Sequence, residues 1–300
     1  MKTRKSGICA GVFGGITLAC LLLPSIDAAP VLLANYLMNG DANDATSNCP
    51  PMQLYNASFV SNAMLIPAIP GHDHRTSAYI KSFSYDAFTV AVDFKPTSMA
   101  PPWGEAILYG GFWYRWMGFD RVDDRLRITL NNHSLAFDFP EARISTNQWH
   151  RLVCSFDGSG QGIVTFLDGV HLADIQLQNF HFEVVGTKDE VQEKELTFTD
   201  PSIASYFNGF VDNLKVFGQA LTPAEITSLL FPRVDCVRSG STMLLHWPVA
   251  EMDGFILEST PTFSITNVWS PVLPAPVVIS DRYVVPQEIG GPARFFRLRK

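Results

Sequence analysis

The chain has 300 residues, of which 47% are hydrophobic and 17% charged, and its formal net charge is −7. An acidic chain without a basic stripe cannot neutralise a long run of phosphates, so nucleic acid is excluded as a partner. Neutral glycans, or a divalent cation held by carboxylates, match this charge better. A chain of this length can bury a large core without disulfide bonds.

The first 29 residues have the order of a secretory signal. Lys2, Arg4 and Lys5 precede an uncharged apolar run over residues 7–23, and small residues follow it. This order predicts a signal peptide over residues 1–29; an uncleaved anchor is the alternative. Cleavage would remove three positive charges and one negative charge, which takes −7 to −9. We therefore expect a protein of the periplasm, the cell surface or the exterior, with no membrane span after signal removal.

Three cysteines remain after the predicted signal, namely Cys49, Cys154 and Cys236. An odd number allows at most one internal bridge, and the spacing fits no zinc pattern. Cys154 lies in an apolar strand pattern, where a buried free thiol is the simpler interpretation.

Short strands dominate the pattern of the chain. Residues 88–94, 125–130 and 149–156 alternate between apolar and polar side chains and are bounded by turn residues, which is typical of half-buried strands. Asp168-Gly169 lies between two apolar runs and predicts a hairpin with a type I′ turn. Many short strands with few helices indicate an all-β sandwich or barrel.

One short helix is predicted where Thr222, Pro223 and Glu225 supply an N-cap hydroxyl, a proline at the first helical position and a capping-box carboxylate. Ile226 then begins an apolar face, and Pro232 ends the helix. The helix closes the first domain.

A second, β-rich unit is expected over residues 236–300, after a joint at residues 238–241. Its short strands are predicted at residues 243–247, 254–258, 277–279, 283–285 and 294–298. A unit of this size can fold alone or pack on the larger domain.

Four segments of the larger unit resemble, in the same order, the motifs of laminin-G-like domains. They are residues 34–48, 147–152, 165–169 and 207–226, with Asn-Gly-Asp-Ala-Asn-Asp in the first and Phe-Val-Asp-Asn-Leu in the last. The resemblance implies an antiparallel jelly-roll β-sandwich of concanavalin A-like fold over residues 30–233. Residues 236–300 resemble a small β module at the end of exported bacterial proteins, a resemblance that implies no activity.

Many laminin-G-like domains hold a structural calcium between the first loop and the closing strand. Carried over residue by residue, the resemblance implies a site made by Asn39, Asp41, Asn43 and Asp212. The acidic pair usual in the closing strand is here Asp212-Asn213, one charge short. The alternative is a solvated turn in which Asn and Asp cap their own backbone.

The densest aromatic cluster, residues 112–116, is a candidate for ligand binding. In a strand, Trp113 and Arg115 would share one face, and an aromatic ring can stack on the C–H side of a sugar. Packing into the core is the alternative for this cluster. His72-Asp73-His74 has the types of metal ligands, but an exposed polar loop explains it as well.

No catalytic motif is found. Glu251-Met252-Asp253 begins the carboxylate string of a family of concanavalin A-like glycanases, but no second Glu follows. Nucleophile-elbow and phosphate-loop patterns are also missing. We therefore expect a non-catalytic binding or adhesion protein that recognises a glycan or an extracellular protein. A structural envelope or matrix component, and a polysaccharide lyase or glycoside hydrolase, are the alternatives.

Overall fold

The computed structural model describes most of the chain after residue 29, and the expected signal peptide lies outside the described residues. The described ranges are 30–67, 76–84, 86–100, 104–110, 117–131, 133–158, 162–177, 195–200, 205–230, 234–249, 255–261, 268–280, 282–289 and 294–299. Within these ranges no helix is long and apolar enough to cross a membrane.

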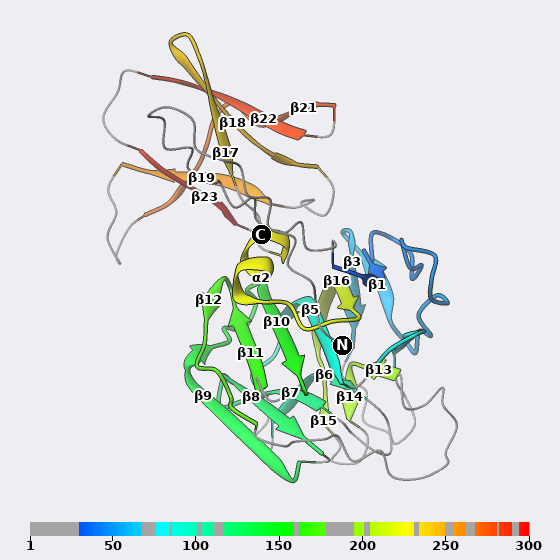
Figure 1. The fold of residues 1–300 in the computed structure, drawn as a ribbon. Coiled ribbons are helices and arrows are strands. Elements are labelled where there is room, and N and C mark those ends of the chain that lie inside the picture. The colour runs from blue at the N-terminus through cyan, green and yellow to red at the C-terminus, as the bar shows by residue number, and fades with distance from the viewer. Residues whose placement is uncertain are drawn as a thin grey trace, which may run out of the picture.

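Two antiparallel sheets form a sandwich (Figure 1). The eight-stranded sheet has the order β12-β11-β10-β5-β16-β3-β2, with β1 also paired to β16. Its strands are β1 (Leu32–Tyr36), β2 (Ser58–Val60), β3 (Ala63–Ile66), β5 (Ala87–Pro96), β10 (His150–Asp157), β11 (Gly162–Leu167), β12 (Val170–His171) and β16 (Gly209–Phe217).

The six-stranded sheet has the order β4-β13-β6-β7-β8-β9. Its strands are β4 (Ser77–Tyr79), β6 (Glu105–Gly110), β7 (Met117–Val122), β8 (Arg125–Leu130), β9 (Leu135–Arg143) and β13 (Glu195–Thr197). A two-stranded ribbon of β14 (Thr199–Asp200) and β15 (Ser205–Tyr206) follows β13 in the chain.

The C-terminal module consists of β17 to β23 and contains two small sheets. Their strands are β17 (Asp235–Ser239), β18 (Thr242–Pro248), β22 (Arg282–Glu288) and β21 (Val277–Ile279) in one sheet, and β20 (Ser270–Pro271), β19 (Ile256–Thr260) and β23 (Phe295–Arg299) in the other. The observed architecture confirms the predicted fold class, an antiparallel sandwich followed by small β sheets.

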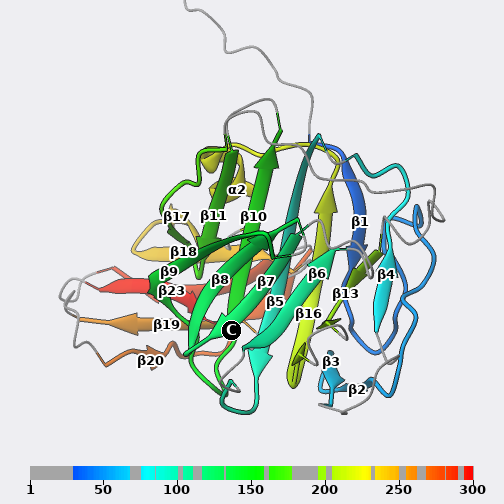
Figure 2. The ribbon, with the colours of Figure 1, turned by 90° about the horizontal axis from the view of Figure 1, so that it is seen from below.

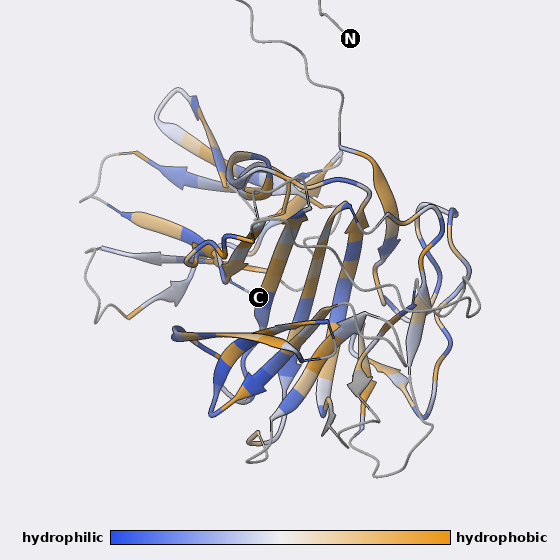
Figure 3. Ribbon diagram, turned by 60° about the horizontal axis from the view of Figure 1, so that its bottom comes forward, coloured by the Kyte–Doolittle hydropathy of each residue, from blue (hydrophilic) through white to orange (hydrophobic). Residues whose placement is uncertain are grey.

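Alternation along the strands builds the core of the sandwich. In β5, Phe88, Val90, Val92 and Phe94 point between the two sheets and are almost completely buried, whereas Ala91 points to the opposite, outer face. Apolar residues colour long parts of these central strands orange (Figure 3). Burial of the inner faces of both sheets is the main force that holds the sandwich together.

Helix α2 (Pro223–Leu230) covers part of the outer face of the eight-stranded sheet, where Ile226 and Leu230 pack with Ala91 and Val153. The predicted capping box is confirmed, since Glu225 accepts the Thr222 N–H at 2.8 Å. The C-terminal module lies on this same side, opposite to the six-stranded sheet (Figures 1 and 2).

The predicted hairpin is confirmed, with Asp168 and Gly169 at φ values of 52° and 82° between β11 and β12. The predicted joint at residues 238–241 is wrong. Arg238 and Ser239 pair with Met243 and Thr242, so this segment is a hairpin turn between β17 and β18. A polar Gly-Ser sequence looks the same in a joint and in a turn, because both need a permissive backbone.

The three cysteines are free thiols, and Cys49 and Cys154 are buried whereas Cys236 is exposed. Complete burial in β10 raises the pKa of the Cys154 thiol, which is therefore an inert packing residue. The predicted burial of Cys154 is confirmed.

Candidate functional site

A cleft of about 580 Å³ lies where the C-terminal module meets the sandwich. Asp93, Trp149 and Arg151 line its sandwich wall, and Phe255, Arg297 and Arg299 line its module wall. Its size falls within the range of small-molecule sites, and it joins aromatic rings to a few charged groups. This cleft is the candidate functional site.

The sandwich wall is built on the outer face of β5 and β10. Asp93 and Arg151 are paired in register, and their neighbours in both strands point into the core. The guanidinium of Arg151 forms a two-pronged pair with Asp93, with its Nη2 2.7 Å from Oδ2, and Asn213 also donates to Oδ2 at 2.9 Å. Arg151 donates a further bond to the carbonyl oxygen of Leu230 in α2. All three nitrogens of the guanidinium are thus bonded, two to Asp93 and one to Leu230.

The β11–β12 turn forms the rim of the cleft. Asp168 accepts the backbone N–H of Arg151 at 2.8 Å with one oxygen and lies 2.7 Å from Nδ1 of His150 with the other. The Ser145 N–H lies 2.9 Å from Nε2 of the same ring. His150 is 5% exposed, so these contacts hold the start of β10, and with it Trp149, in one position.

The module wall comes from β23 and from Phe255, the residue that precedes β19. Glu258 and Arg297 are cross-strand partners, and Arg297 Nε donates to Glu258 at 2.9 Å. The second guanidinium, of Arg299, lies 3.5 Å from the same carboxylate. Arg151 reaches from the sandwich to within 5.7 Å of the centre of the Phe255 ring. A cation–π contact therefore joins the two walls.

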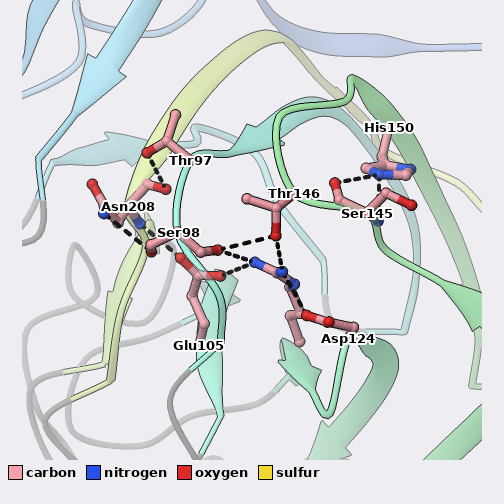
Figure 4. Close-up of polar contacts among 9 residues, drawn as sticks. Thr97, Ser98, Glu105, Asp124, Ser145, Thr146, His150 and Asn208 are labelled. Atoms are coloured by element: carbon pink, nitrogen blue, oxygen red, sulfur yellow. Dashed lines mark hydrogen bonds and ion pairs between the residues drawn. The ribbon is translucent and has the colours of Figure 1, made fainter.

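A buried polar network fixes the loops beside this rim (Figure 4). Arg121 has no exposed surface and pairs with Glu105 at 3.0 Å. Its guanidinium also donates to the carbonyl oxygen of Ser98 at 2.7 Å, to Thr146 at 2.7 Å and to Asp124 at 2.5 Å.

The network ties together loops that are far apart in the sequence. Ser98 follows β5, Asp124 lies in the β7–β8 turn and Thr146 precedes β10. Asn208, before β16, adds a bond from its N–H to Glu105 at 3.0 Å. Burial raises the pKa of Glu105 above its ordinary value, although the Asn208 N–H and Arg121 oppose this shift. The network therefore sets the path of the segment that leads to Trp149.

A family model for the concanavalin A-like lectin/glucanases superfamily matches residues 70–227, more than half of the chain. The chain belongs to this superfamily. The match covers the strands that build the sandwich wall of the cleft and the first part of α2, and it ends before Leu230 and the C-terminal module.

Solved structures of low sequence identity are similar to this concanavalin A-like chain. Trypanosoma rangeli sialidase with the inhibitor DANA is 16% identical at a TM-score of 0.50; the match covers 68% of this chain and a third (33%) of the sialidase. Domain 4 of AbnA, a GH43 extracellular arabinanase from Geobacillus stearothermophilus, in complex with arabinotriose, is 18% identical at a TM-score of 0.49. This match covers 67% of this chain and 98% of the arabinanase domain. The botulinum neurotoxin serotype D/C binding domain is 11% identical at a TM-score of 0.49, and the match covers 80% of this chain and 69% of the toxin domain. No curated protein matches by sequence.

The predicted calcium ligands belong to two parts of the concanavalin A-like domain. Asn39, Asp41 and Asn43 lie in the loop after β1, where Asp41 accepts the Asn43 N–H at 2.9 Å. Asp212 is buried in β16 and accepts the Asn213 N–H at 2.9 Å. Across the described ranges, no three His, Cys, Asp or Glu side chains cluster so as to hold a metal. The calcium site stays a prediction.

A different carboxylate organises the loop after β1. Asp44 accepts the backbone N–H groups of Asn35 at 2.7 Å and Cys49 at 2.8 Å, together with the Thr46 hydroxyl at 2.6 Å. Although burial alone would raise the pKa of Asp44, these hydrogen bonds hold it below its ordinary value. Asp44 thus caps the backbone of its own loop, which is the arrangement that the sequence offered as the alternative to calcium binding at Asn39, Asp41 and Asn43.

The predicted ligand-binding residues Trp113 and Arg115 fall between β6 and β7 in the sequence and lie outside the described residues. The His72–His74 motif, between β3 and β4 in the sequence, also lies outside them. The sequence did not indicate Trp149, Arg151 and Phe255 as site residues. The sequence indicates residues 147–152 only as one of the segments that resemble laminin-G-like domains. No local signal could have revealed the cleft, because Phe255 in its second wall lies more than 100 positions after Trp149 in the first.

Proposed function

We propose that this chain is an exported, non-catalytic binding protein that holds a saccharide in the cleft between the concanavalin A-like domain and the C-terminal module. The observation that supports the proposal is the cleft itself, in which half-buried rings of Trp149 and Phe255 stand beside fixed charged groups. Aromatic faces suit the apolar side of a sugar ring, and fixed polar groups suit its hydroxyls. The superfamily, which comprises lectins and glucanases, is consistent with a saccharide ligand.

The carboxylates of the cleft support binding rather than catalysis. Glycosidases need one carboxyl group that donates a proton and a second that acts as base or nucleophile. Asp93 is held by the guanidinium of Arg151 and the amide of Asn213, and Asp168 is held by His150 and the Arg151 N–H. Both carboxylates are bonded as structural acceptors. We therefore propose a lectin-like role, with export assigned by the first 29 residues.

The test measures the binding of an oligosaccharide panel to residues 30–300 by titration calorimetry. Trp149→Ala and Phe255→Ala should each raise Kd by about tenfold or more, because each removes an aromatic contact at the centre of the site. Tyr55→Ala is the matched control, since Tyr55 is 37% exposed and contacts Thr76, away from the cleft. Equal affinity in all three variants would remove the cleft from this function.

A further inference from the structure

Cations alternate with aromatic rings along a surface that includes the cleft and extends beyond it on both sides. On the sandwich, Lys95 Nζ lies 5.0 Å from the centre of the Phe210 ring and 6.0 Å from that of Trp149. At the cleft, Arg151 approaches Phe255 at 5.7 Å. On the module, the guanidinium of Arg297 lies 4.3 Å from the centre of the Trp269 ring.

The strand register explains why the sandwich half of this surface is continuous. Lys95 and Phe210 are direct partners in β5 and β16, and Trp149 immediately precedes the β10 residue that pairs with Phe94. The three side chains therefore form one row across three neighbouring strands, next to the row that holds Arg151. All four rings, Phe210, Trp149, Phe255 and Trp269, are half-buried, so each keeps an accessible part.

The charges along this surface differ in how they are neutralised. Arg151 and Arg297 have close carboxylate partners in Asp93 and Glu258. Within the described part of the chain, the contacts of Lys95 are with aromatic rings rather than carboxylates. Arg299, with 58% of its side chain exposed, shares Glu258 at 3.5 Å with Arg297. Lys95 and Arg299 are thus available cations in a protein whose net charge is −7.

We infer that the ligand is an anionic saccharide, which places sugar rings on the aromatic faces and its carboxylate or sulfate groups against Lys95 and Arg299. This inference rests on the proposed saccharide function and specifies its ligand class. A neutral sugar would use the rings but would bring no negative charge to Lys95 or Arg299. An ammonium and a guanidinium are the groups that bind carboxylates and sulfates in proteins.

The experiment compares three probes of equal length with residues 30–300: an oligogalacturonate, a sulfated galactan oligosaccharide and a neutral galactan oligosaccharide. We expect at least one anionic probe to bind about tenfold or more tightly than the neutral probe, since each exposed ion pair contributes up to about fivefold. Raising the salt from 50 to 500 mM should weaken this binding, because exposed charges are screened, and should leave neutral binding unchanged. The two anionic probes distinguish carboxylate from sulfate.

Variants of Lys95 test the position of the anion. Lys95→Gln should reduce the preference for the anionic probe about fivefold, and Lys95→Arg should keep it. Lys81→Gln is the control, because it makes the same charge change at an exposed loop position. If the neutral probe binds as tightly as the anionic ones, the inference is overturned and the proposed function stands. If no probe binds, the proposed function fails and the inference fails with it.

Discussion

The sandwich and the C-terminal module are both β structures, but they differ greatly in how much they bury. The sandwich encloses large side chains such as Tyr36, Phe88 and Phe156 between two full sheets. The core of the module is a small group around Trp247, and Leu273 is 80% exposed in the same unit. A small core gives little free energy of unfolding, so the module should open first. The cleft therefore has one firm wall and one weaker wall.

The largest effect is expected for Trp247→Ala, which removes the largest buried side chain of the module. We expect a loss of about 3–5 kcal/mol in the module's free energy of unfolding, which should unfold the module and leave the sandwich folded. Hydrogen exchange should show fast exchange in β17 to β23 and unchanged protection in β5 and β10. Val237→Ala, at a site that is 52% exposed, is the control. If both units lose protection together, the comparison is wrong.

The firm wall can be tested at Arg121. Arg121→Met leaves Glu105 buried without its guanidinium partner, which should cost about 3–5 kcal/mol of the sandwich's free energy of unfolding. Arg127→Met removes the partner of Asp138 in a pair that is 35% and 63% exposed, and should cost less than about 1 kcal/mol. Denaturant unfolding of both variants gives the difference directly.

The cost of Arg121→Met should depend on pH. Burial already raises the pKa of Glu105, and loss of Arg121 raises it further. The native state then holds a proton that the unfolded state has released, so stability falls as pH rises above the ordinary pKa of a glutamate. The variant should therefore be closer to the unchanged protein at pH 5 than at pH 8. The same gap at both values would mean that Glu105 does not titrate in this range.

A smaller effect is expected in the loop after β1. Asp44→Asn loses an acceptor for several N–H groups and should lower the free energy of unfolding by about 1.5–3 kcal/mol near neutral pH. Because the folded-state pKa of Asp44 is lowered, its contribution is present above pH 3.8 and disappears as pH falls through the folded-state pKa. Acid unfolding curves should therefore converge below pH 3.8. Asp86→Asn, at an exposed turn, is the control, and curves that stay parallel in acid would contradict the assignment.

The sequence predicts the fold far better than the site. The alternation of apolar and polar residues correctly predicts β5, β8 and β10, and the prediction of a turn at Asp168-Gly169 is confirmed. Both signals depend on neighbouring residues only. Arg121 lies inside a strand and carries no local sign of burial; its role depends on loops that begin at residues 97, 123 and 144. Trp149 and Phe255 become neighbours through the packing of the module, which no short pattern encodes.

The smallest effect concerns calcium, which the resemblance predicts at Asn39, Asp41, Asn43 and Asp212. The closing strand supplies one carboxylate fewer than usual, so we expect weak binding, with a gain of about 1.4 kcal/mol at a free calcium concentration of ten times Kd. Thermal unfolding with EDTA and then with added calcium measures it. A rise in melting temperature that is confined to the sandwich transition and abolished by Asp212→Asn would show that calcium stabilises the sandwich wall of the cleft. If millimolar calcium gives no rise, the sandwich owes its stability to its core and its polar network alone.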